Sequence, residues 1–393
     1  MATHLAAVSL GKDQPFEVQT RATPKPGPGE LLIAVKSVAL NPADAIMRNT
    51  GFLVSQYPAV IGVDMAGLVL EIGEGVPTAA DAGAAADAQA PLYIPGITRV
   101  AAYAATIWKS CNPDYGAFQE MCIVPWQHAV PLPNSGMSWN HAATLPVSVE
   151  VPLNAWDDMG IPRMGTLGKI YAPPPPSSAR TDTNKGEQEV SLKKGEALLV
   201  WGASSSVGTM AVQTGQLLRK DPGSSFAAVY ATCGWANKGY VASLGADRVF
   251  DYKDPRVVEA IVSAAKEDGL VIRHCFLAIG ALTACQAVLK EFLGDGQHGT
   301  TAKIGSAPPL PAGAEDVEGI TTMFLQPSLV ESERLEQYRY WMGTWLRTNL
   351  IKGTIKPSPE PTVVGKGVGA INTAVDRMSR GVSCTKLIVE VAE

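Results

Sequence analysis

The distribution of apolar residues divides the chain into a region of short strands and a region in which strands and helices alternate. Residues 197–201 form an apolar run with the length of a buried strand, and the small residues 202–208 follow it. In the next segment, 210–218, apolar side chains recur at helical spacing. A strand, a tight turn and a helix in this order present backbone N–H groups to a phosphate. The pattern therefore predicts a nucleotide-binding unit.

The turn departs from the dinucleotide-binding pattern G-x-G-x-x-G. Only Gly208 stands at one of the three glycine places, and Ala203 and Ser205 occupy the others. An ordinary turn that binds no nucleotide therefore stays an alternative. The next strand, 226–233, ends without the Asp or Glu that would bind a ribose 2′-hydroxyl, and Lys238 follows it. Because cations and hydrogen-bond donors hold a 2′-phosphate, we expect NADPH rather than NADH, unless Lys238 is an ordinary solvated lysine.

Strands and helices continue to alternate after this point. The expected strands are 248–252, 270–279 and 301–306, and the expected helices are 238–244, 254–267 and 281–292. This order predicts an α/β fold with a doubly wound parallel sheet. Ligands of such sheets bind at the carboxyl ends of the strands. Residues 232–238, Tyr252, 279–280 and 306–307 would therefore share one edge.

The region before residue 145 is rich in Gly, Pro and short β-like runs. We expect strands at 31–40 and 115–124, and a strand pair with glycine bends at 59–73. The Ala-rich stretch 78–91 is expected to be a surface excursion. This region therefore predicts a β-rich, barrel-like domain.

The remaining segments set the predicted domain bounds. Residues 139–145 have a helical pattern that breaks at Pro146 and Pro152, and 160–195 are expected to form an inserted loop. The last segments are expected to be a helix (332–350), an extended piece (356–364), a helix (366–380) and a strand (386–391). We expect one domain over 1–145, completed by 350–393, and a second over 146–349.

Composition excludes several classes of protein. The 393 residues carry a net charge of −5, which argues against nucleic acid or an anionic membrane surface as partner. No apolar run is long enough to cross a membrane, and residues 1–8 lack the features of a signal peptide. The six cysteines are scattered without C-x-x-C pairs, so we expect buried free thiols and a cytoplasmic protein.

Several motifs together resemble the medium-chain dehydrogenase/reductase superfamily. They are Asn41-Pro42-Ala43-Asp44, 62–67, 116–120, 201–208 and 244–247. Three segments are similar to those of fungal zinc-independent members: 41–44, the turn 201–208 and the closing 381–387. These members are quinone-oxidoreductase-like proteins and enoyl reductases that act in trans with polyketide synthases. The resemblance implies a β-rich GroES-like domain and a Rossmann domain, and it allows a monomer or a homodimer.

The resemblance also implies site residues. Contacts to the cofactor are expected from Asn41, Asp44, Gly202, Ser204, Ser205, Ser206, Val207, Gly208, Cys233, Gly234, Asn237, Lys238, Tyr252, Ile279, Gly280, Ala307, Leu387 and Ile388. Contacts to the substrate are expected from Ile46, Ser148 and Val151. For Asn41 and Asp44 the alternative is a cap at a loop, where Asn-Pro and Asp are common.

Zinc is not expected. Zinc alcohol dehydrogenases of this superfamily have a Cys shortly after the first strand and a Gly-His-Glu motif, whereas this chain has no Cys in 41–46 and has Gly-Val-Asp at 62–64. His128 and His141 have no neighbouring ligands that would complete a zinc site, so we interpret them as structural. Without a Lewis acid, the reaction implied is hydride transfer to a double bond conjugated with a carbonyl, or to a quinone.

Two positions depart from the relatives. Ile46 stands where many carry Tyr or Lys, and Val151 where a hydroxyl is expected. The proton that follows the hydride would then come from solvent or from a residue of the chain. Asn41, Asp44 and Glu150 are the catalytic candidates, and burial in an apolar site would raise the pKa of Glu150. A helix cap or an ion pair is the alternative for Glu150.

Three functions remain open. The first is an NADPH-dependent reductase of activated C=C bonds, in an enoyl thioester or an enone, in polyketide or other secondary metabolism. The second is a quinone or general enone reductase, and the third is an NADPH-binding protein without catalysis. The sequence shows no pronounced basic cluster for a carrier protein, which favours a free small substrate, although a polyketide synthase stays a possible partner.

Overall fold

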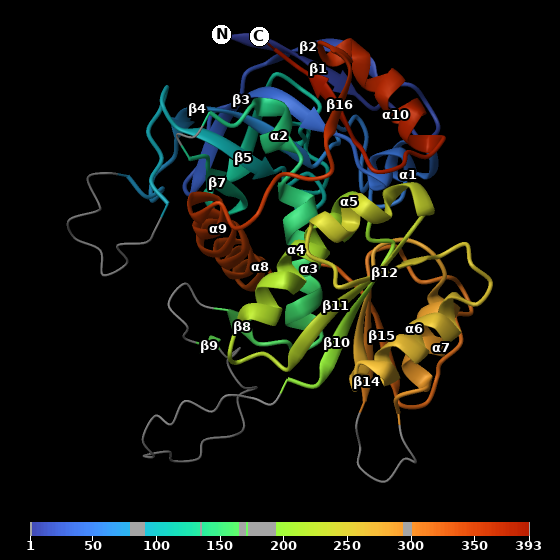
Figure 1. Ribbon diagram of the computed structural model, residues 1–393. Helices are drawn as coiled ribbons and strands as arrows, with labels where there is room; N and C mark the ends of the chain where they lie inside the picture. Colours follow the sequence, from blue (N-terminus) through green and yellow to red (C-terminus); the bar gives the residue numbers. More distant parts are fainter. Residues whose placement is uncertain are drawn as a thin grey trace. The chain divides into compact units, whose positions relative to one another are not determined.

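The computed structural model describes residues 2–78, 91–133, 136–164, 170–171, 194–293 and 301–392 (Figure 1). The chain forms two compact units. Unit 1 comprises Met1–Glu150 and Pro327–Glu393, and unit 2 comprises Val151–Gln326. Most of the predicted surface excursion 78–91 and of the predicted loop 160–195 lies outside the described residues.

Unit 1 is built on a seven-stranded sheet. Its strands run in the order β16-β17-β3-β4-β5-β7, and β6 pairs with β3. A separate pair, β1 and β2, lies outside this sheet. The bounds are β1 (Thr3–Val8), β2 (Glu17–Ala22), β3 (Glu30–Ala39), β4 (Asp64–Ile72), β5 (Arg99–Tyr103), β6 (Met121–Pro125), β7 (Ala129–Pro131), β16 (Pro361–Lys366) and β17 (Lys386–Glu390). The predicted β-rich domain is confirmed.

The glycines of 59–73 do not divide this segment into a strand pair, as the sequence suggested. Only β4 forms there, and Gly67 lies inside it. A Cβ on Gly67 would lie 2.2 Å from the carbonyl oxygen of Ala34, so the glycine lets β3 and β4 approach closely. Gly62, with a φ of +90°, precedes the strand and packs against the ring of Phe118.

The helices of unit 1 correct two expectations. Its longer helical segments are α1 (Pro42–Thr50), α2 (Trp139–Ala143), α8 (Glu331–Tyr338), α9 (Arg347–Lys352) and α10 (Ile371–Ser379), with a π-helical stretch η5 (Arg339–Leu346) between α8 and α9. The predicted helix 332–350 is thus π-helical in its middle. Its residues belong to unit 1 rather than to the second domain, because η5 packs on β7 and both α8 and η5 pack on the short helix η3 (Trp126–His128).

Prolines do not end the helical pattern after residue 145. Helix α3 (Pro146–Asp158) begins at Pro146 and contains Pro152. A proline in the first turn costs little, because the N–H it lacks would have no intrahelical partner there. Pro152 cannot donate to the carbonyl of Ser148, so the helix tolerates one missing hydrogen bond.

Unit 2 is a six-stranded parallel sheet covered by helices, which confirms the predicted doubly wound α/β fold. The strand order is β12-β11-β10-β13-β14-β15. The strands are β10 (Glu196–Trp201), β11 (Phe226–Cys233), β12 (Arg248–Asp251), β13 (Val271–Leu277), β14 (Ala302–Ser306) and β15 (Ile320–Phe324). The helices are α4 (Ser206–Lys220), α5 (Lys238–Ser243), α6 (Val257–Glu267) and α7 (Leu282–Lys290), and a short pair, β8 (Arg163–Met164) and β9 (Ile170–Tyr171), lies apart.

Both faces of this sheet are buried. Ala197, Leu199 and Trp201 belong to a core that includes side chains of α6 and α7. On the other face, Gly215 of α4 lies against Leu198, where an added Cβ would be 3.0 Å from a Leu198 methyl carbon. Alternating residues of β10 thus face different helices, which explains its continuous apolar sequence. Among the described residues, no helix has the length and apolar character needed to cross a membrane.

Candidate active site

Two glycines determine the turn between β10 and α4. Gly202 has a φ of +81°, and a Cβ there would lie 2.6 Å from the carbonyl oxygen of Ile279. A Cβ on Gly208 would lie 2.4 Å from the carbonyl oxygen of Gly202. The helix therefore starts in direct contact with the end of the strand. The left-handed conformation falls on Gly202, one residue before the first glycine place of the G-x-G-x-x-G pattern, which Ala203 occupies.

Ser205 caps helix α4. Its Oγ donates to the carbonyl of Gly202 at 2.8 Å and accepts from the amide of Gly208 at 3.2 Å. The start of a helix leaves the amides of Ser206 and Val207 without intrahelical acceptors. Residues 204–207 are partly exposed, so this helix start can bind a phosphate through its amides and the helix dipole.

Aromatic rings and two ammonium groups lie beyond the ends of β11 and β12. Trp235 is 74% exposed, and Nζ of Lys238 lies 4.7 Å from the centroid of its ring. The amide of Tyr252 donates to the carbonyl of Cys233 at 3.2 Å, and Nζ of Lys253 lies 5.8 Å from the Tyr252 ring. Exposed rings with adjacent cations suit an adenine ring and a phosphate. Lys253 is absent from the sequence-based candidates, although its position next to Tyr252 could have suggested it.

The remaining candidates of unit 2 lie at the same edge of the sheet. Gly234 adjoins Tyr252, and the amide of Asn237 donates to the carbonyl of Gly234 at 2.9 Å. Ile279 is exposed after β13, and Gly280 has a φ of +125°. The amide of Ala307 follows β14 and donates to the carbonyl of Leu277 at 2.9 Å. The structure thus brings the predicted cofactor residues of unit 2 to the carboxyl ends of neighbouring strands.

Unit 1 contains a buried polar cluster. Nζ of Lys386 lies 2.8 Å from Oδ2 of Asp64 and donates to Oδ1 of Asn41 at 2.6 Å. Nδ2 of Asn41 donates to Oδ2 of Asp64 at 3.0 Å, and the amide of Val147 donates to Oδ1 of Asp64 at 2.8 Å. The ammonium and the carboxylate are therefore paired and hydrogen-bonded, as buried charges must be. Sequence reasoning missed Asp64 and Lys386 as members of the site, because 322 positions separate them (386 − 64).

Asp44 lies at the start of α1, beside this ion pair. Its Oδ2 accepts the amide of Asn41 at 2.7 Å, and Pro42 occupies the first turn of the helix. Oδ1 of Asp44 is buried and has no hydrogen-bond partner among the described residues. Burial raises the pKa of Asp44 to about 7, against the lowering effects of the Asn41 amide and the Lys386 charge. Asp44 therefore completes the capping box of α1 with Asn41, and its raised pKa lies near neutral pH.

Glu150 is buried near a cluster of aromatic side chains. Burial raises the pKa of Tyr103, and the charge of Glu150 raises it further. The pKa of Tyr338 is also raised, first by burial, then by Tyr103 and by Glu150. The rings of these two tyrosines lie 5.2 Å apart, and His128 stacks on Tyr338 with 3.9 Å between ring centroids. Burial lowers the pKa of His128 to about 3, so its imidazole is neutral and donates from Nδ1 to the carbonyl of Tyr103.

The other predicted residues of the site differ in exposure. Ile46 is partly exposed on α1, whereas Ser148 on α3 is buried and its Oγ has no hydrogen-bond partner within the described ranges. Val151 follows on α3 and is partly buried. Leu387 and Ile388 are buried on β17, so only their backbone is available for a contact with a cofactor.

No group of three or more His, Cys, Asp and Glu side chains that could hold a metal ion occurs in the described part of the chain. Nε2 of His141 lies 3.2 Å from Glu360, and its Nδ1 lies 2.7 Å from Oγ of Ser138. His128 is engaged with the aromatic cluster. Both histidines thus make contacts within unit 1 that account for their positions.

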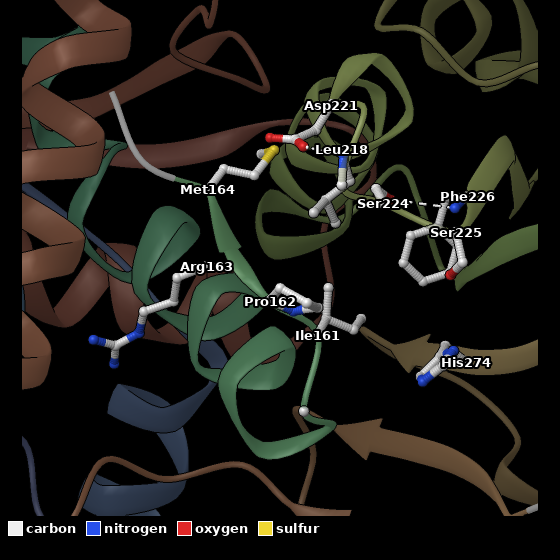
Figure 2. A pocket seen from close by; sticks show the side chains of 12 residues that line it. Ile161, Pro162, Arg163, Met164, Leu218, Asp221, Ser224, Ser225, Phe226 and His274 are labelled. Carbon is white, nitrogen blue, oxygen red and sulfur yellow. Dashed lines mark hydrogen bonds between the residues drawn. The ribbon is translucent and has the colours of Figure 1, made fainter. Parts of the chain in front are cut away.

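A small cavity of about 120 Å³ in unit 2 lies away from the predicted cofactor residues (Figure 2). It is lined by the end of α4, the start of β11 and the segment before β8, with Leu218, Phe226 and Ile161 among its residues. His274 also lines it, and Nδ1 of His274 lies 3.1 Å from Oε2 of Glu196. The carboxyl ends of the strands are the ligand-binding edge of a parallel sheet. This cavity is therefore not the cofactor site.

Sequence and structure comparisons agree with this arrangement. A family profile described as "Alcohol dehydrogenase GroES-like domain" matches residues 27–134. The chain is 36% identical over 389 residues to the trans-enoyl reductase tndF of Aspergillus flavipes, covering 98% of both chains. It is 38% identical over 336 residues to the trans-enoyl reductase tazE of Aspergillus terreus, covering 85% of this chain and 95% of that one.

A solved structure shows the same fold. An alcohol dehydrogenase superfamily protein from Novosphingobium aromaticivorans matches with a TM-score of 0.72 at 18% identity, covering 99% of this chain and 100% of that chain. A GroES-like unit and a Rossmann unit with this strand edge define a class of oxidoreductases that bind nicotinamide cofactors. The chain belongs to the medium-chain dehydrogenase/reductase superfamily, in the branch that contains the trans-enoyl reductases tndF and tazE.

Proposed function

We propose that this protein is an NADPH-dependent, zinc-independent reductase that saturates the activated C=C bond of an enoyl thioester. The observation that carries the proposal is the 36% identity to a trans-enoyl reductase over 98% of both chains. The reaction needs a bound dinucleotide, a positioned carbonyl and a proton. Unit 2 has groups suited to the dinucleotide, and unit 1 has buried carboxyl groups that are candidates for the proton.

Unit 2 fits the dinucleotide. The amides of Ser206 and Val207 would hold the pyrophosphate, and Gly202 and Gly208 leave room for its approach to the backbone. The ammonium groups of Lys238 and Lys253 would pair with a 2′-phosphate, which supports NADPH over NADH. When bound, the nicotinamide supplies the hydride.

The proton has two candidate sources in unit 1. Asp44 is buried beside the Lys386–Asp64 pair. With a pKa of about 7, its carboxyl is partly protonated at neutral pH. Glu150 is buried near Tyr103 and Tyr338. A carboxyl with a pKa near the working pH is an effective general acid, which favours Asp44 as the proton store.

The test is oxidation of NADPH and, in parallel, of NADH by the purified protein. The acceptors are an α,β-unsaturated thioester, a simple enone and a quinone. We expect NADPH consumption with the thioester, with loss of the thioester's conjugated absorbance. Turnover of the quinone or the enone alone would make the protein a general reductase. Tight binding of NADPH without turnover of any acceptor would make Ile46 and Val151 marks of a non-catalytic protein.

A further inference from the structure

Asn41 lies where three neighbouring strands of unit 1 meet. β3 ends at Ala39, which pairs with Asp64 on one side and with Ile388 on the other. Asp64 is the first residue of β4 and Lys386 is the first residue of β17, so both belong to strand ends that flank the end of β3. Asn41 comes directly before α1 and is 5% exposed. The fold thus brings an amide, a carboxylate and an ammonium together at one end of the sheet.

The orientation of the Asn41 amide is fixed by two charged neighbours. Its Oδ1 accepts from Nζ of Lys386 at 2.6 Å, and its Nδ2 donates to Oδ2 of Asp64 at 3.0 Å. An ammonium only donates and a carboxylate only accepts, so a reversed amide would place a donor against Lys386 and an acceptor against Asp64. Because the amide is planar, these two hydrogen bonds also determine the direction of the second N–H of Nδ2.

This second N–H has no acceptor among the residues that the structure describes. In the first turn of α1, Oδ1 of Asp44 is likewise buried without a hydrogen-bond partner from the described ranges. A buried donor left without an acceptor costs about 1–3 kcal/mol. Ile46, the substrate candidate further along α1, has no polar side-chain atom. Asn41 therefore offers a ligand oxygen an oriented hydrogen-bond donor.

Stability alone does not account for the buried charges around Asn41. The side chains of Lys386 and Asp64 are 2% and 0% exposed, and the amide of Val147 donates to Oδ1 of Asp64 at 2.8 Å. Replacing a buried ion pair by apolar side chains of similar volume is often neutral or stabilising, because burial of the charges costs free energy. Charges that only fill space are thus dispensable, whereas charges that orient a neighbouring amide are not.

We propose that Asn41 is a catalytic residue whose second N–H donates to the carbonyl oxygen of the substrate, and that Lys386 and Asp64 are positioning residues that orient this donor. The inference rests on the proposed function and adds the group that stabilises the charge formed during the reaction. When hydride adds to the β-carbon of the enoyl thioester, the C=C electron pair forms a new double bond between the α-carbon and the carbonyl carbon. The carbonyl π pair moves onto oxygen, and Asn41 holds this enolate oxygen. A proton then bonds to the α-carbon, and the C=O bond re-forms in the saturated thioester.

Asn41→Ala tests the donor. At saturating NADPH and crotonyl-N-acetylcysteamine, kcat should fall by about 100-fold or more, the usual loss for one donor to a developing oxyanion. The Kd of NADPH, measured by calorimetry, should stay constant. Asn140→Ala is the matched control, because Oγ of Ser37 donates to Oδ1 of Asn140 at 2.6 Å and Nδ2 of Asn140 donates to Oε1 of Glu390 at 2.9 Å. The control should keep the kcat of the wild type.

Two results would overturn the role of Asn41. One is a fall in kcat no larger than that of Asn140→Ala. The other is a loss of activity that saturating NADPH restores, with a weaker Kd for NADPH. The acceptor would then be an oxygen of the cofactor, such as that of the nicotinamide carboxamide, rather than an oxygen of the substrate.

The double variant Lys386→Met/Asp64→Leu separates positioning from stability. It removes both charges, so it should recover much of the free energy of unfolding that Lys386→Met loses. Its kcat should stay as low as that of Asn41→Ala, because the amide is free to rotate. Lys386→Arg keeps a cation that can donate to Asn41, so it should retain more of the kcat than Lys386→Met. Equal kcat values in the wild type and the folded double variant, or in Lys386→Arg and Lys386→Met, would overturn the positioning role.

Binding separates this inference from the proposed function. If the protein reduces only the enone or the quinone, the proposed function fails, and the same variants test Asn41 with that acceptor, whose carbonyl oxygen needs the same donor. If it reduces no acceptor, calorimetric titration of the NADPH-bound protein with crotonyl-N-acetylcysteamine replaces the kinetics. Binding that is weaker in Asn41→Ala by about fivefold to tenfold, the worth of one hydrogen bond, would support the donor. Equal binding by the wild type and Asn41→Ala would overturn it.

Discussion

The turn of unit 2 and the polar cluster of unit 1 are built in opposite ways. The turn is made of backbone: Gly202 and Gly208 are required because any side chain would overlap a carbonyl oxygen. The cluster is made of side chains: Lys386 and Asp64 are charged groups joined through Asn41. The first is determined by steric exclusion, and the second depends on charge and protonation.

This difference predicts how each region responds to change. A site made of backbone tolerates changes of pH and salt but no added volume. A site made of buried side chains tolerates changes of volume better than the loss of one charge, because an unpaired buried ion is costly. The following predictions test this contrast.

The largest effect is expected from Gly202→Val. A left-handed residue with a branched side chain costs about 1–2 kcal/mol, and overlap with the Ile279 carbonyl adds about 1–3 kcal/mol. We expect a loss of about 2–5 kcal/mol in the free energy of unfolding, the sum of these two costs, and no measurable NADPH binding by calorimetry. Gly195→Val is the control, because an added Cβ there has no atom within 4 Å. Equal losses in both variants would mean that steric exclusion does not determine the turn.

Next in size is Lys386→Met, which leaves the Asp64 carboxylate buried without its cation. Breaking such a pair costs about 3 kcal/mol or more, measured as the free energy of unfolding in urea. The double variant Lys386→Met/Asp64→Leu should recover much of this loss, because it removes both charges. Lys366→Met is the control, with an expected change below about 1 kcal/mol, since its pair with Glu390 is exposed. A loss in Lys386→Met no larger than in the control would show that the buried pair is not the source of stability.

The same contrast explains which parts of the fold were predictable. The strands and helices of unit 2 follow from runs such as 197–201, whose alternate residues face different helices. The expected strand pair at 59–73 was wrong, because the close approach of Gly67 to Ala34 is a contact between strands and leaves no local signal. Pro146 was wrongly expected to break a helix, because sequence alone does not tell a first-turn proline from an interior one.

Site residues follow a similar rule. The turn 202–208 could be located because its residues are contiguous. Asp64 and Lys386 could not be linked, because their pairing depends on strands β4 and β17 both lying next to β3. The raised pKa of Asp44 could not be predicted from the sequence either. Its main cause is burial, which is a property of the folded chain.

A smaller effect is expected from Asp44→Asn. The pKa of Asp44 is about 7 in the folded protein and near 3.8 when unfolded, so the folded state binds the proton more tightly. The stability that this group contributes is full below the unfolded pKa and is lost as pH rises through about 7. Between about pH 5 and about pH 8, the wild type should lose about 2.5 kcal/mol relative to Asp44→Asn, measured by urea unfolding.

Asp376→Asn is the matched control for this pH series. Asp376 pairs with Arg48 at 2.7 Å, but its side chain is half exposed. Its removal should leave the pH dependence of the wild type intact. Parallel curves for the wild type and Asp44→Asn would contradict a proton held at Asp44. If Asp44 also stores the proton of catalysis, the alkaline fall of kcat/KM near pH 7 should disappear in Asp44→Asn along with much of the activity.

The smallest effect is expected from Lys238→Gln, which removes a charged side chain of unit 2 that lies outside the backbone-built turn. Nζ of Lys238 lies over the ring of Trp235 at the exposed edge of the sheet, so its charge is screened by solvent. We expect the KM for NADPH to rise by about tenfold at low salt, equivalent to about 1.4 kcal/mol, and by less as salt is added. The KM for NADH should stay constant, because NADH lacks the 2′-phosphate. Lys266→Gln is the control, because Lys266 of α6 is an exposed lysine that pairs with Glu291. An equal change for both cofactors would mean that Lys238 stabilises its helix rather than selecting NADPH, and Lys253 would be the next cation to test.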